Sequence, residues 1–281
     1  MVKIEYKVLQ DMTGIERFSY SKISSFYTCP YMYKFNYIDG VEGVDNGFAA
    51  IGSLVHSILE RYYRGELEQF EMSQVLLDEF DEAVPDGVVI TFPSGFSKDL
   101  TEQYKEQCVE FLDYFEGFEN YRVAAIEDNF NLLLEIKDRK IILNGFIDLV
   151  IADANNNYYI IDWKSKAKFK NQQEINEYAR QLYTYAIYIK HHYGEWPNEL
   201  RFVQFRINHT EIVKFSEDAL NETLDWIYQT IKKIENENFF FPAIFNSSDI
   251  FFCQNLCDYG QNSGICEYFA DHLATSCNNL Q

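Results

Sequence analysis

The chain has 281 residues, enough for one large domain or for a catalytic domain with a helical elaboration, and 47% of them are hydrophobic. Its 24 basic and 44 acidic side chains give a formal charge of −20, which argues against a general nucleic-acid-binding protein, because phosphate contact favours basic surfaces. No apolar run reaches membrane-spanning length and the first ten residues lack a signal-peptide core, so we expect a soluble, cytoplasmic protein that does not bind membranes.

Two helices are predicted in the N-terminal segment, residues 1–65. The first, over Ser19–Tyr37, is opened by serines, and the second, over Ala49–Arg64, carries an apolar stripe at helical spacing. His56 lies on the flank of that stripe. A lone histidine there is more often structural than functional, although a neutral imidazole is also a good metal ligand.

The next segment, residues 66–119, is strongly acidic. It holds fifteen acidic and two basic side chains, a net charge of −13, so the rest of the chain carries only −7. Helices are predicted over Glu71–Ala83 and Ser97–Phe118, with a Pro- and Gly-marked loop between them. We expect an acidic helical lobe that avoids phosphate and offers a surface to a basic protein partner.

The third segment, residues 120–240, changes from helical to strand periodicity. The predicted order is three strands, a helix, a hairpin and a final helix: Val123–Ile136, Lys140–Ala152, Tyr158–Trp163, Gln172–His192, Arg201–Asn208 with Glu211–Phe215, and Glu217–Glu237. Turns are expected at Asp138–Arg139 and at the asparagine run from Asn155. This pattern predicts an α/β fold in which helices flank a central mixed sheet.

Two acidic residues and a lysine stand out in that segment. Asp148 lies inside an apolar strand and Asp162 lies on the next strand, so the two carboxylates should meet at one sheet edge. Such a pair makes a hard-oxygen site for Mg²⁺ or Mn²⁺. Lys164, two residues after Asp162, shares its face and can orient water or offset phosphate charge. The same D-x-K pattern also fits an ordinary salt bridge at a strand end.

These motifs occur in a series along the chain. His56 lies in GSLVHSILE, Asp148 in LNGFIDLVI, Asp162 and Lys164 in YYIIDWKSK, and Gln181 and Tyr185 in QLYTY. The ordered series resembles the RecB-like branch of the PD-(D/E)XK nuclease superfamily, which includes AddB nuclease domains, CRISPR-adaptation nucleases and phage exonucleases. The resemblance covers residues 19–266 and implies a restriction-endonuclease-like core.

The resemblance also implies roles for single residues. His56, Asp148, Asp162 and the carbonyl of Trp163 would bind the metal, and Lys164 would be the catalytic lysine. Gln181 and Tyr185 would lie near the DNA, sharing a helix face with Tyr178, and Glu127 would stand outside the ligands as a supporting residue. Many family members have glycine at the position of Lys166. Here that residue belongs to a basic row, Lys164, Lys166, Lys168 and Lys170, which reads either as a solvated loop or as a phosphate path.

Three cysteines gather in the last segment, residues 241–281. Cys253, Cys257 and Cys266 could provide three of the four thiolates of a [4Fe–4S] cluster. Cys29, beside Pro30, resembles the remote first ligand of iron–sulfur RecB-like nucleases. Cys277 is an alternate ligand and zinc an alternate occupant. Cys108 falls on an apolar helix stripe and is expected to belong to the core.

Two functions are consistent with the sequence. The first is a metal-dependent DNA nuclease, in particular an exonuclease that acts on single-stranded or end-containing DNA in repair, recombination or a phage system. The second is a catalytically weak binding or regulatory module of the same fold, which the strong acidity favours. The intact His/Asp/Asp/Lys set favours the enzyme, because a scaffold has no physical need for carboxylates gathered around a lysine.

Overall fold

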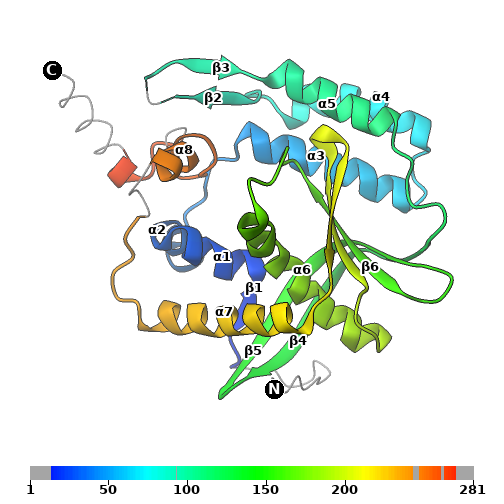
Figure 1. The fold of residues 1–281 in the computed structure, drawn as a ribbon. Helices are drawn as coiled ribbons and strands as arrows, with labels where there is room; N and C mark the ends of the chain where they lie inside the picture. Colours follow the sequence, from blue (N-terminus) through cyan, green and yellow to red (C-terminus); the bar gives the residue numbers. More distant parts are fainter. Residues whose placement is uncertain (1–13, 93, 243–246, 261–262, 270–281) are drawn as a thin grey trace.

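A six-stranded mixed sheet with helices on both faces forms the centre of the molecule (Figure 1). The structure is a computed structural model that describes residues 14–92, 94–242, 247–260 and 263–269. The predicted α/β class, with a mixed sheet flanked by helices, is confirmed. No helix in these ranges is both long and apolar enough to cross a membrane.

The sheet is built around the antiparallel meander β4–β5–β6, as the sequence predicted. β6 then pairs in parallel with β7, β7 pairs antiparallel with β8, and the short β1 lies parallel to β5. The strands span Arg17–Ser19 (β1), Arg122–Ile136 (β4), Arg139–Ala152 (β5), Tyr158–Lys164 (β6), Glu199–Gln204 (β7) and His209–Lys214 (β8). The parallel β6–β7 step requires a crossover, which the helix between these strands provides.

Helices cover both sides of the sheet because the central strands are buried on both faces. Val150 and Ile160 pack toward one cluster, whereas Leu149 and Ile161 pack toward the other. The first side carries α1 (Tyr20–Thr28), α6 (Gln172–Tyr193) and α7 (Glu217–Asn236), and the second carries α3 (Gly47–Tyr63), α4 (Met72–Ala83) and α5 (Thr101–Asp113) (Figure 1).

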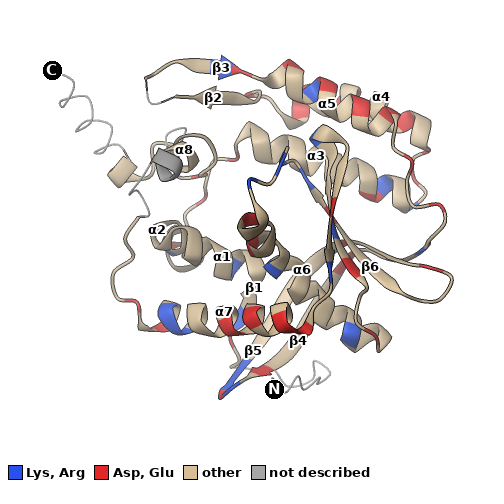
Figure 2. Cartoon of the chain, in the orientation of Figure 1, with Lys and Arg blue, Asp and Glu red and all other residues tan. Residues whose placement is uncertain are grey.

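The acidic segment forms the outer layer over α3. Asp and Glu residues are spread along α4 and α5, whose apolar faces pack inward (Figure 2). The predicted helix Ser97–Phe118 is shorter than expected, since Ser97–Asp99 is β3 and pairs with β2 (Val89–Thr91). The Thr101 hydroxyl accepts a hydrogen bond from the Val88 amide at 2.8 Å, and Asp99 Oδ1 accepts one from the Thr101 amide. These bonds close the hairpin onto the start of α5.

The prediction of one continuous helix over Ser19–Tyr37 is wrong. The chain breaks at Cys29, whose φ of −155° and ψ of 107° are extended, because a residue before proline avoids the helical region. α1 therefore ends at Thr28, and α2 (Pro30–Lys34) and a π-helical turn (Phe35–Asp39) follow. The break places Cys29 beside the C-terminal segment, which was expected to be irregular but contains α8 (Ser247–Asn255).

Candidate metal and nuclease site

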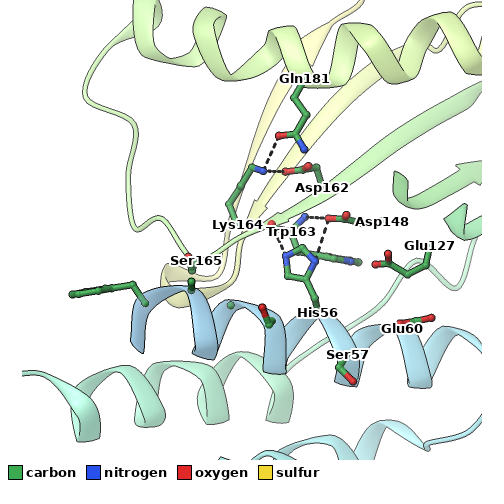
Figure 3. Close-up of a pocket in the computed structure, with 14 residues that line it drawn as sticks. His56, Ser57, Glu60, Glu127, Asp148, Asp162, Trp163, Lys164, Ser165 and Gln181 are labelled. Carbon is green, nitrogen blue, oxygen red and sulfur yellow. Dashed lines mark hydrogen bonds and ion pairs between the residues drawn. The ribbon is translucent and has the colours of Figure 1, made fainter. Parts of the chain in front are cut away.

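A cavity of about 500 Å³ opens at the end of β5 and β6, where α3 from one face of the sheet approaches α6 from the other (Figure 3). The predicted residues His56, Asp148, Asp162, Lys164 and Gln181 all line it, together with Glu127. None of its lining residues belongs to the acidic segment 66–119. Residues of α3 and of the inner strands of the sheet, rather than the acidic lobe, therefore form this cavity.

The register of β5 and β6 brings the two aspartates together. Leu149 pairs with Ile161 at the last step of the ladder, so Asp148 and Asp162 follow directly on the two strands. Asp148 Oδ2 accepts a hydrogen bond of 2.9 Å from the Trp163 amide. Burial raises the pKa of Asp148 well above its usual value, and the charge of Asp162 raises it further. Without a cation, both carboxylates cannot easily be charged.

Lys164 connects this carboxylate pair to α6. Its ammonium lies 2.7 Å from Asp162 Oδ2 and donates a hydrogen bond of 3.0 Å to Gln181 Oε1. Gln181 Nε2 in turn donates to the Tyr185 hydroxyl at 2.6 Å. Burial lowers the pKa of Lys164, but Asp162 and Asp148 outweigh that effect and hold it above its ordinary value. The lysine is thus a fixed positive charge, oriented by Gln181.

His56 reaches the same end of the sheet from α3. Its Nε2 donates to the Trp163 carbonyl at 2.9 Å, and burial lowers its pKa, so the ring is neutral. The Nδ1 lone pair then faces Asp148 Oδ2 at 3.6 Å. Two electron-pair donors facing each other are repulsive unless a proton or a cation lies between them.

Glu127 completes this group of donors. It lies opposite Asp148 across the β4–β5 ladder, between the paired residues Ile126 and Asp128, and its φ of 43° is in the left-handed region. Each of His56, Glu127 and Asp148 offers one atom that could bind a metal, and these three atoms all lie within 4.8 Å of one another. Sequence reasoning placed Glu127 outside the ligands. Its position across the hairpin from Asp148 was the signal that could have placed it at the site.

The donor set is one that Mg²⁺ or Mn²⁺ binds. Carboxylate oxygens, a backbone carbonyl and a neutral imidazole lie together at the cavity. They offer more lone pairs than there are protons to share, and a cation would stabilise this arrangement. Asp162 Oδ2 adds a further sign. It is buried, and apart from its ion pair with Lys164 it accepts no well-oriented hydrogen bond from the described residues. An under-satisfied buried carboxylate oxygen fits a metal ligand.

Gly145 allows Tyr185 to approach the sheet beside this site. A Cβ at this position would lie 2.9 Å from Phe130 Cζ and 3.4 Å from Tyr185 Cε1. We predict that Gly145→Ala lowers the free energy of unfolding by about 1–3 kcal/mol, because the Phe130 ring must shift. Gly52→Ala is the control. Its Cβ would meet Ser165 at 3.8 Å, so urea titration should show unchanged or higher stability. Equal effects of the two variants would contradict the packing argument.

The lysines of the basic row after the site lie in different surroundings. Lys166 is ion-paired to Glu174 at 3.0 Å, and its ammonium lies 5.4 Å from the centre of the Tyr178 ring. Lys168 and Lys170 are exposed. Tyr178 packs on Phe169 rather than lining the cavity with Gln181.

The four predicted cluster cysteines lie together at a second place. Cys29, Cys253, Cys257 and Cys266 line one small apolar cavity between α2 and α8. Burial raises the pKa of the Cys257 thiol to about 12 and also raises that of Cys266. Cys108 is fully buried in the core under α5, as expected, and Cys277 lies outside the described residues.

One family model and two solved structures are similar to this chain. The family model described as the PD-(D/E)XK nuclease superfamily matches residues 17–267, and no curated protein matches the chain. Among solved structures, a candidate exonuclease from Eubacterium rectale is 14% identical with a TM-score of 0.47, covering 87% of this chain and 92% of its own. A second solved structure, that of SSO0001, is 13% identical with a TM-score of 0.39. The match covers 92% of this chain and 90% of that protein.

Proposed function

The chain belongs to the PD-(D/E)XK nuclease superfamily, and we propose that it hydrolyses DNA phosphodiester bonds with Mg²⁺ or Mn²⁺. The observation that carries the proposal is the convergence of His56, Asp148, Asp162 and Lys164 on one cavity. These residues come from α3, β5 and β6, and packing alone gives no reason to bury two carboxylates beside a lysine.

His56, Asp148, Asp162 and the Trp163 carbonyl would hold the metal, with Glu127 as an additional ligand. A cation held by these residues would supply Lewis-acid chemistry for the hydrolysis of the phosphodiester. Lys164 orients the attacking water and offsets charge on the phosphate. Gln181 fixes the lysine through its 3.0 Å hydrogen bond, and Tyr185 fixes Gln181, so both act as positioning residues.

Within the superfamily we place the chain on the RecB-like branch, as an exonuclease acting on single-stranded or end-containing DNA. The motif order His56, Asp148, Asp162–Lys164 and Gln181–Tyr185 supports this assignment. Residues 120–240 would be the nuclease core, and residues 66–119 an acidic lobe away from the DNA. The absence of residues 66–119 from the cavity lining is consistent with that division.

We further propose an iron–sulfur cluster at Cys29, Cys253, Cys257 and Cys266. Four thiols that line one cavity are the ligand set of such a cluster. Zinc, which four thiolates bind in a tetrahedral site, is the alternate occupant.

Digestion of end-labelled DNA tests the nuclease. We predict that the wild-type protein degrades labelled single-stranded or duplex DNA with Mn²⁺ and that EDTA stops the reaction. Asp162→Asn should lose cleavage, since a neutral amide is a poor metal ligand. Asp138→Asn, at the exposed tip of the β4–β5 hairpin, is the matched control and should cleave normally. Metal-independent cleavage, or full activity of Asp162→Asn, would refute the proposal. DNA binding without cleavage would favour the regulatory module.

A further inference from the structure

Arg180 differs from the other arginines in its contacts with the described residues, because its guanidinium packs on aromatic rings instead of donating hydrogen bonds. The other seven each donate a hydrogen bond to a side chain: Arg17 to Asn131, Arg61 to Glu79, Arg64 to Glu60, Arg122 to Asn156, Arg139 to Glu235, Arg201 to Glu199 and Arg206 to Gln107. Among the described residues Arg180 forms no hydrogen bond and no ion pair. A guanidinium carries five N–H donors, so Arg180 keeps its full capacity to bind an anion.

Three helices hold this guanidinium against aromatic rings. Its Cζ lies 4.8 Å from the centre of the Trp226 ring on α7 and 5.8 Å from that of Tyr27 on α1. The two rings meet at 74° with their centres 5.7 Å apart, and the Tyr27 side chain is 56% exposed. Stacking on aromatic faces orients the guanidinium plane and leaves its N–H edge available. We call these three residues the Tyr27–Arg180–Trp226 patch.

The patch adjoins the candidate nuclease site. Arg180 directly precedes Gln181, the residue that holds Lys164. Tyr20, at the start of α1, joins the two places: its ring lies 5.9 Å from Trp226, and its hydroxyl donates to the Glu177 carbonyl on α6. Burial raises the pKa of Tyr20, while the nearby charges of both Lys164 and Arg180 partly offset that rise. Lys164 and Arg180 therefore both lie near Tyr20, which places the patch beside the candidate site.

We propose that the Tyr27–Arg180–Trp226 patch is a binding subsite for single-stranded nucleic acid. Arg180 contacts a backbone phosphate, and the exposed Tyr27 ring stacks on an unpaired base. The single strand is favoured over the duplex because a base must leave its own stack before an aromatic side chain can cover it. The inference rests on the proposed function, since it makes the patch part of the path of that substrate.

Fluorescence anisotropy in EDTA tests the subsite without requiring hydrolysis. The probes are a labelled 20-nucleotide oligothymidylate and a labelled duplex of the same length. Arg180→Gln and Tyr27→Ala are each expected to weaken single-strand binding about tenfold, the scale of one stacked base. For Arg180→Gln the slope of log K against log salt should become shallower by about 0.7, which corresponds to one phosphate contact. Tyr27→Phe should bind as the wild type does.

Arg17→Gln is the matched control, because Arg17 is exposed and already hydrogen-bonded to Asn131. Tyr27→Ala changes an exposed side chain, so it keeps the test decisive if Arg180→Gln fails to fold. Wild-type affinity of Tyr27→Ala, an equal loss on the duplex, or no single-strand binding by the wild type would overturn the subsite.

The two proposals fail separately. A wild-type protein that binds the oligothymidylate through Tyr27 and Arg180 but never cleaves DNA with Mn²⁺ would refute the nuclease and leave the subsite standing. A protein that cleaves DNA, with binding unaffected by Tyr27→Ala, would refute the subsite alone.

Discussion

Lys164→Ala is expected to reduce DNA cleavage by about a thousandfold while leaving Mn²⁺ binding nearly intact. The lysine is the positive charge of the site, and removing one group that stabilises the charge of a transition state costs about 10²–10³ in rate. The proposed metal ligands His56, Asp148 and Asp162 all remain in this variant. Single-turnover cleavage of end-labelled DNA gives the rate, and calorimetric titration with Mn²⁺ gives the affinity.

Two further substitutions separate the roles of Lys164. Lys164→Arg keeps the positive charge but spreads it over a larger, planar guanidinium, so it should rescue cleavage only if charge alone is needed and the compact geometry of the ammonium is not. Lys168→Ala, an exposed lysine four residues further on, should cleave like the wild type. Normal cleavage by a folded Lys164→Ala protein, checked by circular dichroism, would remove Lys164 from the mechanism.

The meander at the centre of the fold was predictable because its strands are long and strongly apolar. Their ends were predicted less well. The β4–β5 turn is at Lys137–Asp138, one residue before the predicted Asp138–Arg139, with Lys137 at a φ of 57°. Asp138 indicated a turn, but no glycine or asparagine marks the residue with positive φ, so the residue types did not fix the position of the turn. The short strands β1 and β2 were missed because three residues show no usable periodicity.

Most of the candidate site was predictable because it depends on local rules. Asp162 and Lys164 share a strand face by alternation, and an asparagine-rich turn brings the strand of Asp148 beside theirs. Glu127 was underrated because its place depends on the register of a long hairpin. The Arg180 guanidinium packs on Tyr27 and Trp226, which are far from it in sequence. No local pattern could therefore predict this contact.

The second large effect is expected at the cysteines. Anaerobically purified protein should be brown, with broad absorbance near about 400 nm and about four irons per chain. Cys29→Ser should bleach this absorbance and lower the melting temperature, because Cys29 is the one ligand contributed by the N-terminal half. It joins α2 to the segment around α8, where the described apolar cluster is small: Phe35, Cys253, Tyr259, Cys266 and Phe269 are its buried members. A metal centre would supply cross-linking that this cluster alone cannot provide.

Cys108→Ala is the matched control, since Cys108 is buried like Cys29 but lies on α5, on the side that faces the core. It should keep the absorbance and the iron, although its melting temperature can fall through lost packing. The loss of colour, rather than the loss of stability, therefore identifies a cluster ligand. A colourless protein with one zinc per chain would replace the cluster with a zinc site. A protein without metal would mean that the four thiols lie together only as apolar side chains of a small core.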